Sequence, residues 1–195
     1  KHVLHARAAL AGQRGRVALT GVSAAALHGF AIHDTSLEAV HLVRLDNGAT
    51  RTEAHTVHHG TRRDIEEEIG SYGGILASAP ARAVWEVACR SSLEGGVVTA
   101  DSALHRSPKL KESLDALHDH FALFPGSTKA RTAMRLVDGR SESPGESVTR
   151  VQFYRYGILM PEPQFAVFGP RGQLVGISDF YWEDFRHLGE FNGKI

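Results

Sequence analysis

The sequence predicts an α/β protein of the α+β kind, with helices and small sheets in separate stretches of the chain. Its 195 residues are 42% hydrophobic and 23% charged, which is ordinary for a globular domain. Short alternating segments typical of strands occur near the beginning and at the end, and segments of helical period lie between them. We therefore expect a first region over residues 1–125, with helices, a small sheet and a helical bundle, and a second region over residues 126–195.

The first region begins with two expected helices. Residues 4–12 and 17–30 are rich in alanine, which is a strong helix former. Thr20 or Ser23 is a suitable N-cap for the second helix, because a hydroxyl oxygen can accept from the free N–H groups of a first turn. The pattern predicts a pair of short helices at the start of the fold.

Strands follow these helices. Residues 38–44 and 54–60 alternate apolar and polar side chains. The turn-forming sequence Asp46-Asn47-Gly48 lies between them, which predicts that the two strands pair as a hairpin. Residues 73–79 predict a third strand of the same sheet.

From Pro80 to about residue 139 the apolar residues recur at helical spacing. Pro80 suits the first position of a helix, because its missing N–H would have no partner there. Ser107-Pro108 and Gly126-Ser127 mark later helix starts, and the helix over 126–140 connects the two regions. The apolar side of the first of these helices consists of Val84, Trp85, Val87 and Ala88.

The second region predicts one helix followed by three strands. Ser143 as N-cap, Pro144 at the first position and Glu146 at the third have the arrangement of a capping box. Gly157 ends this helix after Tyr156. The strands are expected over residues 163–168, 173–182 and 186–193, with a hairpin turn at 169–172.

Two acids of this region fall inside apolar runs. Asp179 lies within ISDFYW, and Glu190 lies between Leu188 and Phe191 in the last predicted strand. An ionised carboxylate is costly in such a place unless it is paired or bound to a cation. Two acids on adjacent strands suit Mg²⁺ or Mn²⁺, which prefer oxygen ligands and can activate water against a phosphodiester.

The order of these residues resembles a known superfamily. A helix glutamate (Glu146), a strand aspartate (Asp179) and the following E-x-N-G-K, from Glu190 to Lys194, are similar to the PD-(D/E)xK nucleases, especially the branch related to very-short-patch repair endonucleases. The string SESPGES…YGILMPEPQ…DF…EFNG resembles the C-terminal domain of actinobacterial AbiEi-like proteins, and LTGVSAAALHGF, SAPARAVWEVAC and TADSAL recur in order in that group. The resemblance implies an AbiEi-like α+β region over 1–125 and a nuclease-like domain over 126–195.

The resemblance also implies a site and an architecture. The expected domain is an αβββ restriction-endonuclease-like core, which in the superfamily continues with a further strand and helix. By resemblance, Asp179 and Glu190 are metal ligands, the carbonyl of Phe191 is a backbone ligand, Glu146 is a helix-borne auxiliary acid, and Gln164 is a supporting polar group. The implied cofactor is Mg²⁺ or Mn²⁺.

Asn192 departs from the pattern of the family. It stands where that branch commonly has aspartate and where the wider superfamily has the catalytic lysine. An amide can neither take a proton from water nor balance the charge of a cation. Lys194 would point to the same side of a continuing strand and could substitute for the lysine. Asn192 therefore leaves open a natural loss of activity, an engineered inactivation, or a tolerated variant.

Each acid has a structural alternative. Glu146 satisfies a helix N-terminus as the third residue of a capping box, without any metal. Asp179 could pair with Arg171 or Arg186, and Glu190 could pair with Lys194. Four basic residues along one predicted helix, which could follow a phosphate backbone or form a solvated face, are Lys129, Arg131, Arg135 and Arg140.

Other residue types exclude some classes of function. The single cysteine, Cys89, cannot form an internal disulfide and is expected to be a buried apolar residue. The twelve histidines show no metal-ligand spacing and are expected at the surface or in the core. Lysine plus arginine and aspartate plus glutamate balance at 22 each, so overall charge does not favour nucleic acid.

The leading hypothesis from the sequence is a Mg²⁺-dependent DNA endonuclease in repair, defence or mobile-element biology, with DNA as partner. The alternative is a non-catalytic, antitoxin-like DNA-binding regulator or a partner-binding module. A protein partner or a homodimer also fits the sequence. No apolar run approaches the ~20 residues needed to span a bilayer, so we expect a cytoplasmic protein without membrane contact.

Overall fold

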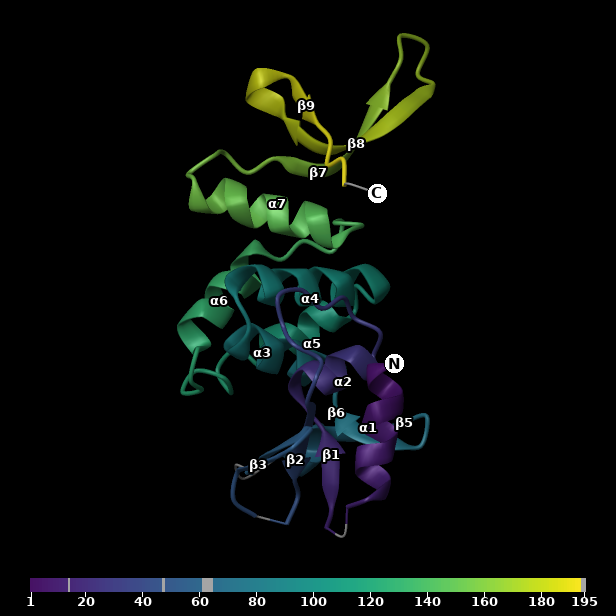
Figure 1. Ribbon diagram of the computed structural model, residues 1–195. Coiled ribbons are helices and arrows are strands. Elements are labelled where there is room, and N and C mark those ends of the chain that lie inside the picture. Colours follow the sequence, from purple (N-terminus) through teal and green to yellow (C-terminus); the bar gives the residue numbers. More distant parts are fainter. Residues whose placement is uncertain (14, 47, 61–64, 194–195) are drawn as a thin grey trace.

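The computed structural model describes residues 1–13, 15–46, 48–60 and 65–193. Within these ranges the chain forms seven α-helices, a six-stranded sheet and a three-stranded sheet, so the predicted α+β class is confirmed. Figure 1 shows the six-stranded sheet at one end, a layer of helices in the middle, and the three-stranded sheet at the other end. None of the helices in the described ranges is long and apolar enough to pass through a bilayer.

Six strands build the N-terminal sheet, in the order β3-β4-β2-β1-β6-β5. Helices α1 (His2–Ala11) and α2 (Gly21–Leu27) pack against it and against each other. The strands are β1 (Val17–Leu19), β2 (Val40–Arg44), β3 (Arg51–Glu53), β4 (Thr56–His59), β5 (Ile69–Tyr72) and β6 (Ile75–Ser78), with the short 3-10 helix η1 (Glu66–Glu68) before β5.

The predicted helix over 17–30 is correct only over Gly21–Leu27. Val17, Ala18 and Leu19 form a strand in which every residue is buried, between the antiparallel β2 and the parallel β6. Burial between two strands outweighs the helix propensity of Ala18 and Leu19, because tertiary packing routinely overrides that preference. The helix α2 begins after Thr20, but the Thr20 hydroxyl makes no capping hydrogen bond and donates instead to Glu86 Oε2 at 2.5 Å.

The predicted hairpin between 38–44 and 54–60 is wrong. The strands β2 and β4 are neighbours but run parallel, with Val40 opposite Thr56 and Val43 opposite His59. The chain between them forms an extra strand, β3, which turns back tightly onto β4. Parallel strands need a crossing connection, which the segment containing β3 supplies. Asn47 of the expected turn lies outside the described residues.

The helical layer follows the predicted helix starts. Its members are α3 (Pro80–Arg90), α4 (Leu93–Arg106), α5 (Leu110–Ala116) and α6 (Ser127–Leu136). Pro80 is at the first position of α3, and Cys89 is buried, as the sequence predicts. The side chains of Val84, Trp85 and Ala88 lie in the large core cluster that joins the helices to the sheet.

The C-terminal part consists of α7 (Pro144–Arg155) and the sheet β7-β8-β9. Figure 1 shows α7 between the helical layer and this sheet. The strands are β7 (Glu162–Phe168), β8 (Leu174–Trp182) and β9 (His187–Gly189), with the 3-10 helix η2 (Glu183–Phe185) before β9. The chain therefore has the predicted helix-strand-strand-strand order.

The third predicted strand is shorter than expected. It ends at Gly189, so Glu190 follows the strand instead of lying inside it. The reason is local: the N–H of Phe191 donates to the carboxylate of Asp179 and not to a carbonyl of β8. A side chain of the neighbouring strand thus replaces the next backbone partner and ends the ladder.

Candidate metal-binding site

The N-terminus of α7 fixes the first acid. The Ser143 hydroxyl accepts from the N–H of Glu146 at 3.2 Å and donates to Glu146 Oε1 at 2.6 Å, and the N–H of Glu142 donates to Oε2 at 2.9 Å. These contacts confirm that Glu146 caps the helix. Glu146 is 6% exposed, so its carboxylate is held in one place by donors on its own helix end.

A buried network behind α7 joins it to α4. Asp101 accepts from Arg150 at 2.9 Å, from the Ser147 hydroxyl at 2.8 Å and from the N–H of Asp138 at 2.7 Å. Burial raises the pKa of Asp101 to about 6 although the Arg150 guanidinium opposes the shift. The network fixes α7, and therefore Glu146, relative to the helical layer.

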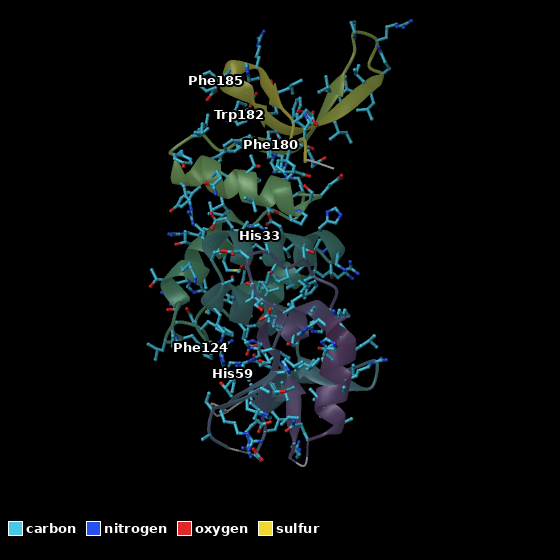
Figure 2. The ribbon with its side chains drawn as sticks, in the orientation of Figure 1. His33, His59, Phe124, Phe180, Trp182 and Phe185 are labelled. Carbon is cyan, nitrogen blue, oxygen red and sulfur yellow. The ribbon has the colours of Figure 1, made fainter. Side chains whose placement is uncertain are left out.

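Aromatic side chains hold the sheet against the other side of α7. The ring of Phe153 lies 5.4 Å from that of Phe180 and 5.3 Å from that of Trp182, centroid to centroid, with edge-to-face geometry. Figure 2 shows Phe180 and Trp182 on the C-terminal sheet. The indole N–H of Trp182 donates to the carbonyl of Leu159 at 2.6 Å. Strand β8 is thereby fixed on α7.

Asp179 is brought to Glu146 through Gln164. The register places Gln164 of β7 beside Asp179 of β8, because Pro163 faces Phe180 and Phe165 faces Ser178. Gln164 Nε2 donates to Glu146 Oε2 at 3.0 Å and to Asp179 Oδ1 at 3.3 Å. Three predicted site residues from three different elements therefore meet at one amide group.

Phe191 completes this cluster from the segment after β9. Its N–H donates to Asp179 Oδ2 at 2.7 Å, so both oxygens of Asp179 accept hydrogen bonds. The Phe191 ring packs against Gly145, where an added Cβ would lie 2.0 Å from Cε1 of the ring. Only glycine leaves room for this ring beside the first turn of α7.

The structure does not bring the Glu190 side chain into the cluster. Glu190 follows the pair formed by Phe180 and Gly189, so it comes one step after the last pair of the ladder. Its side chain is exposed and has no hydrogen bond or ion pair among the described residues. Asn192 is likewise exposed, and Lys194 lies outside the described residues.

The alternative ion pairs of Asp179 are not formed. Within the described ranges Asp179 has hydrogen bonds to Gln164 and Phe191 but no ion pair with Arg171 or Arg186. A carboxylate without a cationic partner, close to a second carboxylate, can serve as a ligand for a metal ion.

The oxygen donors fit a hard divalent cation. Mg²⁺ is commonly held by one or two carboxylates, with water and substrate phosphates as its other ligands. Glu146 and Asp179 supply two carboxylates that share one hydrogen-bond donor. No group of three or more His, Cys, Asp or Glu side chains that could hold a metal occurs in the described part of the chain. Two carboxylates leave the other positions of such a cation to water and substrate.

The four basic residues do not form a single free surface. The Arg140 guanidinium is paired with Asp138 at 2.9 Å and with Glu162 at 3.2 Å. Arg131 and Arg135 are four residues apart on α6 and share a side of that helix. Lys129 is half-buried on α6. Arg135 is the most exposed of the helix-borne members, and contact with nucleic acid stays a prediction.

Some features of the site carry no clear signal in the sequence. Gln164 has a φ of +55°, which is uncommon for a residue with a side chain. Gly145 is needed for the approach of Phe191, yet it appears in the sequence as an ordinary residue of a helix start. The Asp101 to Arg150 pair joins residues far apart in the chain. In the sequence, only the position of Gly145 directly after Pro144 indicates that another side chain packs against the first turn of this helix.

Comparison with known proteins gives two relatives and no family. No family model matches the chain, and no solved structure matches it. The chain is 30% identical over 169 residues to "Uncharacterized protein MT2308" of Mycobacterium tuberculosis (strain CDC 1551 / Oshkosh). It has the same identity to "Uncharacterized protein Rv2248" of Mycobacterium tuberculosis (strain ATCC 25618 / H37Rv). In both cases the match covers 87% of this chain and 60% of the relative, so the chain resembles part of two longer mycobacterial proteins.

Proposed function

We propose that the C-terminal part of this chain is a Mg²⁺- or Mn²⁺-dependent DNA endonuclease centre, acting in repair, defence or mobile-element biology. One observation carries the proposal: the amide of Gln164 joins Glu146 and Asp179, two acids from α7 and β8. The resemblance of the same residues to PD-(D/E)xK nucleases supports it. The AbiEi-like assignment of residues 1–125, the boundary near residue 126 and a cytoplasmic location are part of the same proposal.

The residues of the cluster would have different roles. Asp179 and Glu146 would hold the cation, with water and substrate phosphate as its other ligands, while Glu190 stays outside this pair. A bound Mg²⁺ supplies activation of water and stabilisation of the charge that develops on a phosphodiester. The N–H of Phe191 keeps Asp179 oriented, because its hydrogen bond holds Oδ2 in place.

Calorimetric titration with Mn²⁺ tests the metal site. Wild-type protein should bind Mn²⁺, and Asp179→Ala should lose at least about tenfold in affinity, as expected for a lost ligand. Asp184→Ala is the matched control, because Asp184 is an exposed acid of the nearby η2 and is not part of the cluster. Equal loss in both variants would contradict the assigned ligand.

Plasmid nicking tests the enzymatic activity. Wild-type protein with Mn²⁺ should convert supercoiled plasmid to the open circle, and chelation should stop the reaction. Asn192→Asp restores the acid that the related branch commonly has, and should increase the rate. No cleavage by either protein would refute the endonuclease.

A second candidate is a non-catalytic, antitoxin-like DNA-binding regulator or partner-binding module. It is favoured by the finding that the described residues contain no group of three acids, histidines or cysteines suited to a metal. This protein would bind DNA equally with and without chelator and would leave plasmid intact. Metal-independent retention of duplex DNA in a gel shift, without cleavage, distinguishes it from the endonuclease.

A further inference from the structure

The side-chain amide of Gln164 lies between two carboxylates. Its Nε2 is 3.0 Å from Glu146 Oε2 and 3.3 Å from Asp179 Oδ1. An amide nitrogen carries two hydrogens, so each carboxylate can accept one of them. The NH₂ group thereby separates two like charges that would otherwise repel each other.

The same carboxylate oxygens are the ones that a divalent cation would use. An NH₂ group carries partial positive charge, so a cation that binds these oxygens repels it and competes with it for their lone pairs. The other end of the amide, Oε1, is a suitable ligand for Mg²⁺. Among the described residues Oε1 has no hydrogen-bond partner, so turning the amide breaks no contact on that side. The terminal torsion of glutamine is soft, so a half-turn needs no change in the backbone.

The backbone at Gln164 is held in a conformation that most side chains avoid. Its φ is +55°, whereas its neighbours in β7 continue the ladder with β8. Such outliers are strained and cluster at functional sites. Here the outlier coincides with the residue that contacts both acids.

We propose that Gln164 is a metal-responsive switch within the proposed nuclease centre. Without a cation, its NH₂ group joins Glu146 and Asp179. When Mg²⁺ binds, the amide turns, releases both carboxylates and presents Oε1 to the ion. The switch rests on the proposed function, because it requires Glu146 and Asp179 to bind the metal. Gln164 acts as a positioning residue that keeps the two acids together until the metal arrives.

Side-chain amide signals in a nitrogen-proton NMR spectrum test the switch. The chain contains four glutamines and two asparagines, so its side-chain NH₂ region is sparse. The Gln164 signals are assigned by their loss in Gln164→Met, which keeps the length of the side chain and the same backbone demand. Gln152 is the internal control, because its Nε2 donates to Glu94 Oε1 at 3.0 Å away from the cluster.

Titration with Mg²⁺ should move the Gln164 NH₂ signals towards the position of a free amide and leave those of Gln152 unchanged. The backbone N–H signals of Glu146 and Phe191 should shift in the same titration, because both residues contact the ligands. Shifts of these backbone signals with unmoved Gln164 side-chain signals would overturn the switch but not the metal site. If Mg²⁺ moves none of these signals, the metal site and the switch are both wrong.

Discussion

The ring of Phe191 lies against Gly145, so closely that a Cβ at position 145 would be 2.0 Å from Cε1 of the ring. This contact joins the segment after β9 to the first turn of α7. It also positions the peptide of Phe191, whose N–H donates to Asp179 at 2.7 Å. Gly145 therefore affects the candidate ligand Asp179 indirectly, by leaving room for the Phe191 ring.

Gly145→Ala should displace Phe191 and release Asp179. Because Phe191 is 40% exposed and can move outwards, the loss of folding free energy should be about 1 kcal/mol, the low end for overpacking. The main effect should be weaker Mn²⁺ binding and a shifted Phe191 N–H signal, measured by calorimetry and NMR.

Gly176→Ala is the control for this substitution. An added Cβ at Gly176 of β8 meets nothing within 4 Å, so it should change neither Mn²⁺ affinity nor the Phe191 signal. A Gly145→Ala protein with wild-type metal affinity would show that the Phe191 contact does not support the site.

Asp101 should make stability fall as the pH rises. Its pKa is raised from 3.8 to about 6 by burial, so the folded state binds this proton more tightly than the unfolded state does. Below about pH 4, Asp101 therefore stabilises the folded state by on the order of 3 kcal/mol. This contribution is lost as the pH rises to about 6. Asp101→Asn should remove this part of the pH dependence.

The measurement for Asp101 is urea unfolding of both proteins between pH 4 and pH 7. The difference in unfolding free energy between wild type and Asp101→Asn should change steadily over this interval. A constant difference would mean that Asp101 ionises with an ordinary pKa in the folded protein.

His59, in contrast to Asp101, should make the stability of the protein fall as the pH drops. His41 Nδ1 and His59 Nε2 are 3.0 Å apart on β2 and β4, and burial, together with nearby Arg90, lowers the pKa of His59 to about 4. The unfolded state then binds more protons between about pH 4 and 6.5, so stability falls as the pH drops through this range.

His59→Gln should lose less stability than wild type on acidification from pH 6.5 to pH 4. Thermal unfolding at several pH values checks this, with the two proteins compared at each pH. Glu86 and His58 also act on His59, so the comparison is made with both present. Parallel stability curves would contradict the lowered pKa.

If α6 contacts DNA, substitution of Arg135 should change the salt dependence of DNA affinity more than substitution of Arg140. Arg135 is exposed, and its guanidinium donates only to the Thr132 hydroxyl on its own helix, at 3.3 Å, among the described residues. Arg140 is already paired with Asp138 and Glu162. Arg135→Ala should lower the slope of log affinity against log salt by about 1, as for one lost phosphate contact.

Fluorescence anisotropy with duplex DNA at several salt concentrations measures these slopes. Arg140→Ala should leave the slope nearly unchanged, because its charge is neutralised within the protein. An equal effect of both substitutions would contradict the assignment of Arg135 to a DNA-facing surface.

Local signals predicted much of the fold. The helix at Pro80 and the capping box at Ser143 depend on neighbouring residues, and both occur in the structure. The parallel pairing of β2 with β4 could not be predicted in this way, because it depends on an extra strand between them. The sequence of Val17 to Leu19 likewise predicts a helix, because its burial between two strands is set by residues far away in the chain.

The sequence by itself determined the order of one helix and three strands and placed Glu146, Gln164 and Asp179 on the first three of these elements. Only the tertiary structure decided that the three side chains meet at one amide and that Glu190 stays outside this contact. The reason is physical: capping and periodicity act over a few residues, whereas the approach of side chains from separate elements depends on packing, such as Phe191 against Gly145, between segments far apart in the chain.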